Sequence, residues 1–251
     1  MTTATTTASV GHEPALLGQT VVLIGGSAGI GLETARRARR EGAEVVLAAR
    51  NPQRLEQAAL AVGARSTAAF DATDPAAIRR FFDDLPGPID HILITAGGPT
   101  YTPLLELNAE QVGTTLGDHV VMALDVARSA IGKMPPGGSL VLMGGTGGRR
   151  ISRQLGLSSA ATAVLPPFTA TLALELAPVR VNLIAAGFVD TPLSASLLGD
   201  DLDARREQLR STLPIGRVVG PEDVAALAVH LMANTALTGA TYDIDGGQQF
   251  V

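Results

Sequence analysis

Seven residues near the start of the chain have the types and spacing of a phosphate-binding turn. A short apolar run is followed by Gly25-Gly26-Ser27-Ala28-Gly29-Ile30-Gly31, and a helical pattern begins at once. Glycines permit positive φ and let the backbone approach a pyrophosphate, while the N–H groups of the following helix favour its charge. A glycine motif alone would also fit a tight turn, but between a strand and a helix it predicts a dinucleotide site.

The end of the second apolar run indicates which dinucleotide binds. Folds that prefer NAD place an acidic residue there for the ribose hydroxyls, whereas an Arg accommodates the 2′-phosphate of NADP. This chain has Arg50 and Asn51 at that point, with no carboxylate in the last turn of the run. An exposed Arg after a strand is often merely solvated, but the missing acid points the same way. We therefore expect NADP(H) as the cofactor.

Short β-rich runs alternate with longer helical stretches, such as 30–41 with its exposed arginines. Near-continuous apolar strands separated by amphipathic helices are typical of a parallel sheet covered on both faces. Right-handed crossovers then make the sheet doubly wound. We predict one α/β, Rossmann-like domain with a doubly wound parallel sheet of about seven strands. The expected strands are 20–24, 44–49, 66–70, 91–95, 139–143, 180–185 and 241–244.

Composition and charge narrow the possible partners. The 251 residues carry a net charge of −5, which argues against a nucleic-acid or anionic-membrane partner. The chain has no cysteine, and its four histidines lack metal-ligand spacing, so we expect no metal site. Residues 1–18 are rich in Thr and Ala and lack the features of a signal peptide. We expect them to form a flexible tail before a domain over 19–251, in a cytoplasmic protein.

Several motifs in the right order resemble the short-chain dehydrogenase/reductase family. The glycine turn matches the family's Gly-x3-Gly-x-Gly pattern, and Asp71-Ala72 stands where the family's Asp packs beside the adenine. Thr95-Ala96-Gly97-Gly98 is similar to the family's Asn-Ala-Gly segment, with Thr in place of the first Asn. Ala186-Gly187-Phe188-Val189-Asp190-Thr191 is similar to the stretch that receives the nicotinamide, although the usual Pro is Ala186. The resemblance implies that these segments bind the cofactor.

The catalytic positions of the family are changed in this chain. Most members pair a Tyr with a Lys one helical turn later, so that the Lys lowers the pKa of the phenol, which acts as acid or base. The chain has one lysine, Lys133, and its two tyrosines, Tyr101 and Tyr242, are not near it. The resemblance places Ser158 at the Tyr position and Thr162 at the Lys position. The usual Ser–Tyr–Lys residues are therefore absent, and the chain is expected to be a divergent member.

Three side chains are candidates for the missing acid. His119 falls at the family's Asn position, and the ordinary pKa of histidine lies near neutrality, but a histidine packed within its helix is the alternative. Tyr101 follows the fourth strand on the edge of the sheet where ligands bind, but a phenol with no cationic neighbour in the sequence is more typical of a residue that lines the pocket. Ser158 is able to orient a carbonyl by hydrogen bonding. The family's Ser is replaced by glycine at Gly145, with Thr146 one residue further on.

Two further segments lead to predictions about the substrate-binding region and about the oligomeric state. In the family, the region around 191–217 is a lid over the substrate. Its leucines indicate a fairly apolar small-molecule substrate or simple packing on the core. Pro166-Pro167 interrupt the helix that should carry the catalytic pair, at a cost of roughly 3 kcal/mol or more in a helix interior. We therefore expect that helix to start, or restart, near Pro166. Because this helix also builds a dimer face in the family, we expect a homodimer or homotetramer.

These observations favour one function and leave two alternatives open. The favoured function is an NADP(H)-dependent oxidoreductase that acts on a carbonyl or alcohol with a non-standard active site. A non-catalytic NADP-binding pseudoenzyme, serving as a redox sensor or as the partner of an active homologue, is the first alternative. A lyase, isomerase or cyclase on the same scaffold, without net redox chemistry, is the second. The sequence identifies neither the substrate nor the direction of reaction.

Overall fold

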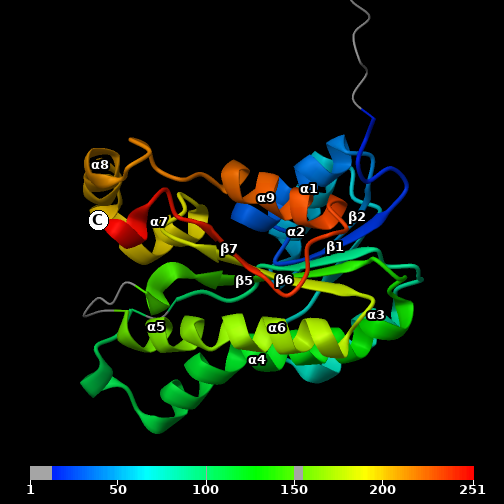
Figure 1. Cartoon of the computed structure of the whole chain (residues 1–251), viewed down its shortest axis with the longest axis horizontal. Coiled ribbons are helices and arrows are strands. Elements are labelled where there is room, and N and C mark those ends of the chain that lie inside the picture. Colours follow the sequence, from blue (N-terminus) through cyan, green and yellow to red (C-terminus); the bar gives the residue numbers. More distant parts are fainter. Residues whose placement is uncertain (1–12, 100, 150–154) are drawn as a thin grey trace, which may run out of the picture.

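The computed structural model describes residues 13–99, 101–149 and 155–251, which form a parallel sheet between two layers of helices (Figure 1). Within these residues the sheet has seven strands, in the order β3-β2-β1-β4-β5-β6-β7, and every neighbouring pair is parallel. This confirms the predicted doubly wound, Rossmann-like α/β fold. The strands are β1 (Thr20–Ile24), β2 (Glu44–Ala49), β3 (Ser66–Ala69), β4 (His91–Ile94), β5 (Ser139–Gly145), β6 (Arg180–Ala186) and β7 (Thr241–Ile244).

The two helical layers bury opposite faces of the sheet (Figure 1). Successive strand residues point to opposite faces, so Val22 packs in the core with α3, α4 and α6, whereas Val21 and Leu23 pack with α1, α2 and α9. The first layer contains α1 (Gly29–Arg40), α2 (Pro52–Val62) and α9 (Pro221–Ala233). The second contains α3 (Pro75–Asp84), α4 (Ala109–Ala130), α5 (Gly156–Ala163) and α6 (Leu165–Glu175).

The predicted element boundaries differ from the observed ones by one or two residues, and the largest difference in a strand is at β5. Strand β5 continues two residues beyond its predicted end, because Gly144 and Gly145 pair with Ala185 and Ala186 of β6. Glycine is disfavoured in strands, so the sequence predicted an earlier end, but the neighbouring strand supports the pairing. Strands β3 and β4 each end one residue earlier than predicted, and the first helix begins at Gly29 rather than at residue 30.

The domain starts before residue 19, which corrects part of the predicted flexible tail. Leu16 is fully buried in the core beside α1, and its N–H donates to the carbonyl of Glu41 at 2.9 Å. The N–H of Ala15 donates to the Glu41 carboxylate at 3.1 Å. The Thr- and Ala-rich composition of the preceding residues concealed this anchor. The remainder of the predicted tail, residues 1–12, lies outside the described residues.

The double proline divides the helix as predicted. Helix α5 ends at Ala163 and α6 begins at Leu165, with Val164 between them. Pro166 and Pro167 therefore lie in the first turn of α6, where their missing N–H groups cost little. By length and composition alone, Gly156–Glu175 is apolar enough to cross a membrane, but 44% of its most apolar 18-residue window is buried within the fold. A core helix that packs on a sheet has the same property.

A buried arginine closes the end of the sheet opposite the predicted cofactor site. The side chain of Arg180, at the start of β6, is 5% exposed. Its guanidinium donates to carbonyl oxygens at the end of α9 and in the loops beside it, which otherwise lack helical partners. The acceptors are Gly137 at 3.1 Å, Leu231 at 2.7 Å, Met232 at 2.7 Å, Asn234 at 3.1 Å and Leu237 at 3.1 Å.

His91 lies beside this arginine at the start of β4. Its Nδ1 is 2.9 Å from the Ser139 hydroxyl, and its Nε2 is 2.7 Å from the side-chain oxygen of Gln19. Burial, together with the charge of Arg180, lowers the pKa of His91 to about 3. The imidazole is therefore neutral in the folded protein at physiological pH and belongs to the framework of the fold.

We predict that His91 makes the fold sensitive to mild acid. The folded pKa lies below the unfolded value of 6.5, so the unfolded chain binds the proton first and stability falls as the pH drops below about 6.5. Between about pH 7 and about pH 5 this group should cost the wild type about 2 kcal/mol of unfolding free energy. Urea titrations at both pH values should show a correspondingly smaller loss for His91→Gln. Equal losses in the two proteins would contradict the assignment.

Candidate functional site

The glycine turn between β1 and α1 leaves no room for side chains. Gly25 has φ +99°, which favours glycine, and a Cβ at Gly25 would collide with the Thr95 hydroxyl. A Cβ at Gly31 would collide with the carbonyl oxygen of Gly25. The N–H groups of Gly25 and Gly26 donate to the carbonyl of Ala48 at 2.8 and 3.1 Å. Glycine is therefore required at positions 25 and 31, and their backbone carries no side chain where the sequence predicted a pyrophosphate.

The N-terminus of α1 is free of side-chain caps. Ala28 stands at the N-cap without a side-chain hydrogen bond, and the first turn carries no acidic residue. By contrast, α2, α3 and α4 each begin with a side-chain acceptor, from Asn51, Asp74 and Asn108 respectively. The exposed N–H groups and the positive end of the helix dipole favour an anion at this point. Ser27 and Ile30, which flank Ala28 and Gly29, are half-buried.

Arg50 and Asp71, both predicted to bind the cofactor, lie at the ends of β2 and β3, near enough for the charge of Arg50 to act on Asp71. The Asp71 carboxylate accepts hydrogen bonds from the Thr73 N–H at 2.9 Å and the Thr73 hydroxyl at 2.8 Å. These bonds hold the pKa of Asp71 below its usual value, with a smaller contribution from the charge of Arg50. Asn51 accepts from the Arg54 N–H at 2.9 Å. Ala72 is 7% exposed and packs in the core.

The residues predicted around the nicotinamide converge from three strand ends. A Cβ at Gly29 would lie 3.3 Å from Thr191, so the segment after β6 rests on the glycine turn. A Cβ at Gly98 would lie 3.3 Å from Leu193, so the same segment also covers the end of β4. The structure thus brings together the glycine turn, the Ala96-Gly97-Gly98 segment and Thr191. Gly187 packs against Asp245 and Gln248, and Val189 is buried beside Val219.

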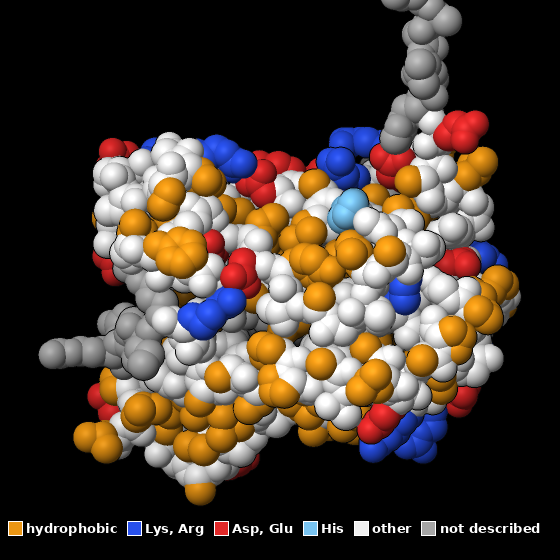
Figure 2. Space-filling model, viewed as in Figure 1, with side chains coloured by type: hydrophobic (Ala, Val, Ile, Leu, Met, Phe, Trp, Pro, Cys, Tyr) orange, Lys and Arg blue, Asp and Glu red, His pale blue; other side chains and the backbone are white. Residues whose placement is uncertain are grey.

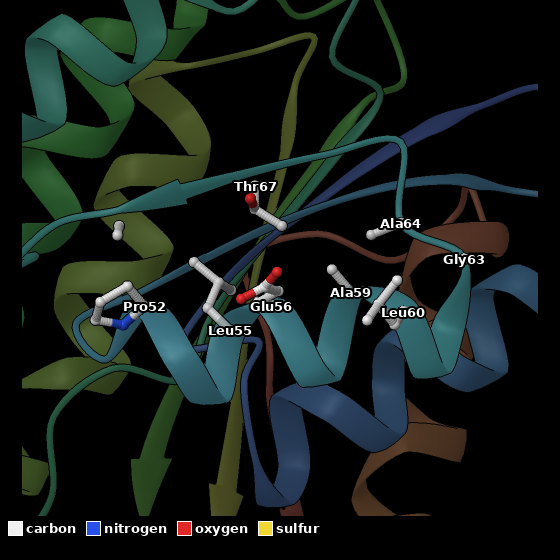
Figure 3. Close-up of a pocket in the computed structure, with 9 residues that line it drawn as sticks. Pro52, Leu55, Glu56, Ala59, Leu60, Gly63, Ala64 and Thr67 are labelled. Carbon is white, nitrogen blue, oxygen red and sulfur yellow. The ribbon is translucent and has the colours of Figure 1, made fainter.

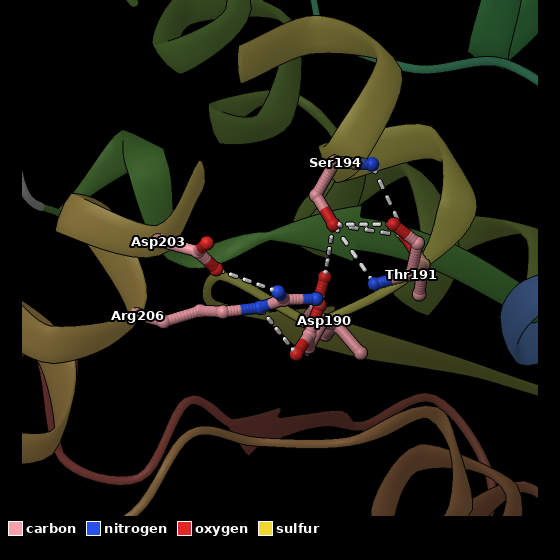
Figure 4. A network of polar contacts seen from close by, with 6 residues as sticks. Asp190, Thr191, Ser194, Asp203 and Arg206 are labelled. Atoms are coloured by element: carbon pink, nitrogen blue, oxygen red, sulfur yellow. Dashed lines mark hydrogen bonds and ion pairs between the residues drawn. The ribbon is translucent and has the colours of Figure 1, made fainter. Parts of the chain in front are cut away.

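Polar contacts fasten the predicted lid region to the end of β6 (Figure 4). Thr191 and Ser194 form a capping box at the start of α7 (Pro192–Leu198). The Arg206 guanidinium, on α8 (Leu202–Thr212), donates two hydrogen bonds to the Asp190 carboxylate, at 2.9 and 2.8 Å. A third donation, to Asp203, is 2.9 Å long. Helices α7 and α8 make up most of 191–217, while movement of this region as a lid stays a prediction.

His119, the first candidate for the missing acid, lies beneath the turn that follows β4. A Cβ at Gly97, which has φ +102°, would lie 2.9 Å from Nε2 of His119. The ring also lines a small cavity of about 10 Å³ whose other lining side chains are apolar. Burial lowers the pKa of His119, an effect that Asp118 partly opposes. The imidazole is therefore biased towards its neutral form.

Tyr101, the second candidate, lies in the segment between β4 and α4. Its side chain is 42% exposed, and within the described part of the chain its hydroxyl has no hydrogen-bond partner. Burial raises the pKa of Tyr101, and the guanidinium of Arg205 on α8 acts in the opposite direction. Sequence reasoning missed Arg205, because a charged residue on an amphipathic helix resembles any other solvated charge.

Ser158, the third candidate, is buried where α5 packs on the end of β5. Its side chain is 8% exposed, and the hydroxyl of Thr162, one turn later, donates to the carbonyl of Ser159 at 3.0 Å. A Cβ at Gly145 would lie 3.3 Å from the Thr162 methyl, and one at Gly148 would lie 3.1 Å from the Cβ of Ala163. The glycines after β5 therefore allow α5 to approach closely, and little space remains for a Ser at Gly145.

The lone lysine has a structural role. Its ammonium donates to backbone carbonyls at the end of α3, those of Phe82, Asp83 at 3.0 Å and Leu85 at 2.7 Å. A cation at a helix C-terminus satisfies carbonyls that lack helical partners and interacts favourably with the dipole. Lys133 thus binds the end of α3 in the second helical layer, and it lies away from the carboxyl ends of the strands.

A separate groove of about 480 Å³ runs between α2 and β3 (Figure 3). Its lining consists mainly of small and apolar residues such as Ala59 and Thr67, with Glu56 as its one ionisable side chain. The residues predicted to bind the cofactor do not line it. The groove therefore adds no chemistry to the candidate site.

A family of known sequences matches almost the whole chain. The family described as Enoyl-(Acyl carrier protein) reductase matches residues 25–249. The matched region extends from the glycine turn to the C-terminal residues that contact Gly187. The chain belongs to the short-chain dehydrogenase/reductase family. This confirms the resemblance that the sequence motifs indicated.

Individual relatives cover nearly the full length of this short-chain dehydrogenase/reductase. The NADP-dependent (R)-specific alcohol dehydrogenase of Lentilactobacillus kefiri is 28% identical, over 92% of this chain and 97% of its own. The MalC Reductase/Diels-Alderase of Malbranchea aurantiaca superposes with a TM-score of 0.88 at 25% identity, covering 95% of this chain and 99% of its own. An NADPH-bound short chain oxidoreductase from Pseudomonas aeruginosa PAO1, containing an atypical catalytic center, gives 0.84 at 25% identity, covering 92% and 98%.

We predict that Gly31→Ala disrupts the dinucleotide turn. The new methyl would meet the Gly25 carbonyl, so the turn must shift and nucleotide binding should be lost. Gly117→Ala, on α4, is the matched control, because a Cβ there meets nothing within 4 Å. That substitution should stabilise the protein by about 1 kcal/mol through helix propensity. Thermal unfolding and nucleotide titration of both variants check this, and tight binding by Gly31→Ala would contradict it.

Proposed function

We propose that this short-chain dehydrogenase/reductase is an NADP(H)-dependent oxidoreductase that interconverts a carbonyl and an alcohol. The observation that carries the proposal is the cradle formed by the glycine turn, the uncapped N-terminus of α1 and the pair Arg50 and Asp71. The absence of a carboxylate at the end of β2 favours the 2′-phosphate of NADP. The NADP-dependent alcohol dehydrogenase and the NADPH-bound oxidoreductase among its relatives support the same cofactor.

Each part of the site has a distinct task in this proposal. NADPH, when bound, supplies the hydride. The α1 N-terminus and the glycine turn hold the pyrophosphate, while Arg50 pairs with the 2′-phosphate. Thr191 and the Gly97-Gly98 segment border the nicotinamide end. The chain must also provide a group that stabilises or protonates the alkoxide that forms on the substrate.

The active site in this proposal is non-standard. Ser158 and Thr162 occupy the Tyr and Lys positions of the family, and Lys133 binds the end of α3 instead. His119, Tyr101 and Ser158 are the candidate groups around the substrate. The relative with an atypical catalytic center supports the idea that the fold sustains oxidoreductase chemistry on an altered site.

The substrate in this proposal is a fairly apolar small molecule. Leu193 of α7 covers Gly98, and Leu104, in the segment after β4, contacts Gly156 at the start of α5. The Leu193 and Leu104 side chains are 46% and 55% exposed. Burial of such surface against a ligand contributes about 25 cal/mol per Å² of apolar area. A substrate with an aliphatic or aromatic body would use this surface.

We predict that Arg50 selects NADPH over NADH. Replacing it by Asp removes a charge-assisted contact and places a carboxylate against the 2′-phosphate, so NADPH affinity should fall about 10- to 100-fold. NADH affinity should stay the same or improve. Fluorescence titration of wild type, Arg50→Asp and the exposed control Arg79→Asp measures both. Failure of the wild type to bind either nucleotide would overturn the proposed function.

A non-redox reaction on the same scaffold is the competing proposal. The MalC relative is named both a reductase and a Diels-Alderase, and the altered positions Ser158 and Thr162 suit a site that shapes a substrate without transferring a proton. The two proposals differ in one measurement. An oxidoreductase consumes NADPH in the presence of a carbonyl substrate, whereas a cyclase or isomerase converts its substrate while the absorbance of NADPH stays constant.

We propose in addition that the protein forms a homodimer or homotetramer through α4 and the α5–α6 unit. Figure 2 shows hydrophobic side chains gathered along the lower edge of the view, where these helices lie in Figure 1. Leu174 on α6 is 82% exposed, and Val121 on α4 is 50% exposed. Apolar side chains in such numbers on one face favour association.

We predict that a charge at Leu174 weakens this association. Leu174→Glu would bury a carboxylate in the proposed contact, so light scattering should report a smaller species than for the wild type. Leu60→Glu is the matched control, since Leu60 is 80% exposed on α2, in the other helical layer. Equal masses for all three proteins would exclude α6 from the subunit contact.

A further inference from the structure

The side chain of Gln248, in the short helix after β7 (Gln248–Phe250), bonds to the segment that is predicted to receive the nicotinamide. Its Oε1 accepts a hydrogen bond from the Phe188 N–H at 2.7 Å, across 60 positions of the sequence. We propose that Gln248 is a positioning residue, which fixes the backbone of Phe188 and through it the nicotinamide end of NADP(H). This inference rests on the proposed oxidoreductase function, and it adds a residue that lies outside the predicted cofactor segments.

The backbone after β6 is bonded to the fold at successive residues. The Gly187 N–H donates to the Ile244 carbonyl at 3.2 Å, and the Asp190 N–H donates to the Val219 carbonyl at 2.9 Å. Both acceptors belong to the main chain, so a side-chain substitution leaves them in place. The Phe188 N–H depends on a distant side chain instead, and an N–H that loses its acceptor away from water is costly. A single substitution is therefore able to loosen the segment at Phe188.

Gly187 leaves room for this contact. A Cβ at position 187 would lie 2.6 Å from the Gln248 Oε1 and 2.6 Å from the Cβ of Asp245. The absence of a side chain therefore lets the turn after β7 lie directly against the segment after β6. The acceptor must be the amide oxygen, because the amide nitrogen of glutamine only donates. The Gln248 amide thus has one orientation that satisfies the Phe188 N–H.

The turn that carries Gln248 is itself held by several contacts. Asp245 is 5% exposed, and its carboxylate accepts from the Gly247 N–H at 2.8 Å and from the Gln249 N–H at 3.0 Å. The Gln248 N–H donates to the Asp245 carbonyl at 3.1 Å. Gly247 has φ +86°, and a Cβ there would lie 2.6 Å from Pro214, which follows α8. The Gln248 side chain therefore extends from a backbone with a fixed position.

Phe188 connects this hydrogen bond to the rest of the candidate site. Its ring centre lies 5.8 Å from the guanidinium carbon of Arg205 on α8. Three residues after Phe188, Thr191 lies against the glycine turn at Gly29. A shift of the Phe188 backbone would therefore move the segment that is proposed to border the nicotinamide. Gln248 acts through this segment rather than by touching the cofactor.

The hydrogen bond should affect one half of the cofactor only. Arg50 and Asp71, proposed to bind the adenosine half, lie at the ends of β2 and β3, whereas Gln248 supports the end of β6. Strands β1, β4 and β5 lie between β2 and β6 in the sheet. Loss of the Gln248 acceptor should therefore weaken the contacts of the nicotinamide end and leave those of the adenosine half in place.

The test compares NADPH with adenosine 2′,5′-bisphosphate, the part of NADPH that lacks the nicotinamide. Gln248→Met keeps the approximate size of the side chain but removes the amide oxygen. NADPH affinity should then fall about 10-fold, as for the loss of one hydrogen bond, whereas the bisphosphate should bind as it does to the wild type. The fluorescence of bound NADPH, which arises from the reduced nicotinamide, should shift towards that of the free nucleotide.

Two further variants separate positioning from a general effect on the fold. Gln248→Glu keeps an oxygen acceptor at the same reach, so it should bind NADPH as the wild type does. Gln249→Met is the matched control at the next position, because the Gln249 amide donates to Asp243 at 3.0 Å and not to the segment after β6. This variant should bind both ligands with wild-type affinity.

Three results would overturn the inference. Equal weakening of NADPH and the bisphosphate in Gln248→Met would assign a merely structural role to the residue. Unchanged NADPH binding in Gln248→Met, or an equal loss in Gln248→Glu, would show that the amide oxygen does not position the cofactor. Failure of the wild type to bind either ligand would instead overturn the proposed function, so the two failures are distinguishable.

Discussion

The contact between Thr95 and the glycine turn is the constraint on which the cofactor site depends. The Thr95 hydroxyl lies 3.2 Å from the carbonyl oxygens of both Ile24 and Gly25, and the Thr95 N–H donates to Ile24 at 2.7 Å. This contact joins the carboxyl ends of β1 and β4, which are neighbours at the centre of the sheet. Strands β2 and β3 lie on one side of this pair, and β5, β6 and β7 lie on the other. A larger residue at Gly25 or Gly31 would separate β1 and β4. The shape of the nucleotide cradle therefore depends on glycine at positions 25 and 31 and on the hydroxyl of Thr95.

The sequence predicted those features that are local or periodic. Central strands such as β1 and β4 are buried on both faces, so their apolar runs are continuous and easily recognised. The glycine turn and Pro166-Pro167 act through the backbone of their own neighbours, and their effects were predicted as well. Features that depend on distant partners were missed. The burial of Leu16 requires Glu41 and the core beside α1, and the cation–π contact of Arg205 requires Phe188, 17 positions away in the numbering.

The proposed active site illustrates how one fold combines a shared binding turn with different chemistry. The residues predicted to hold a dinucleotide lie in the turns after β1, β2, β3, β4 and β6. The positions at which we expect departures from the family's catalytic residues lie on β5, α4 and α5, and α5 packs closely on Gly145. Helices α7 and α8 then border the open part of the site, anchored by Asp190 and Arg206.

The engagement of Lys133 has a practical consequence for covalent chemistry on this protein. Its ammonium group is the one lysine amine of the chain, and it is held by backbone carbonyls at the end of α3. Amine-directed reagents, such as those used for fluorescent labelling, immobilisation and crosslinking, react with the unprotonated and accessible amine. Lys133 should therefore react slowly with such reagents. A label that does attach there would lie beside the end of α3, away from the nucleotide cradle at the carboxyl ends of the strands.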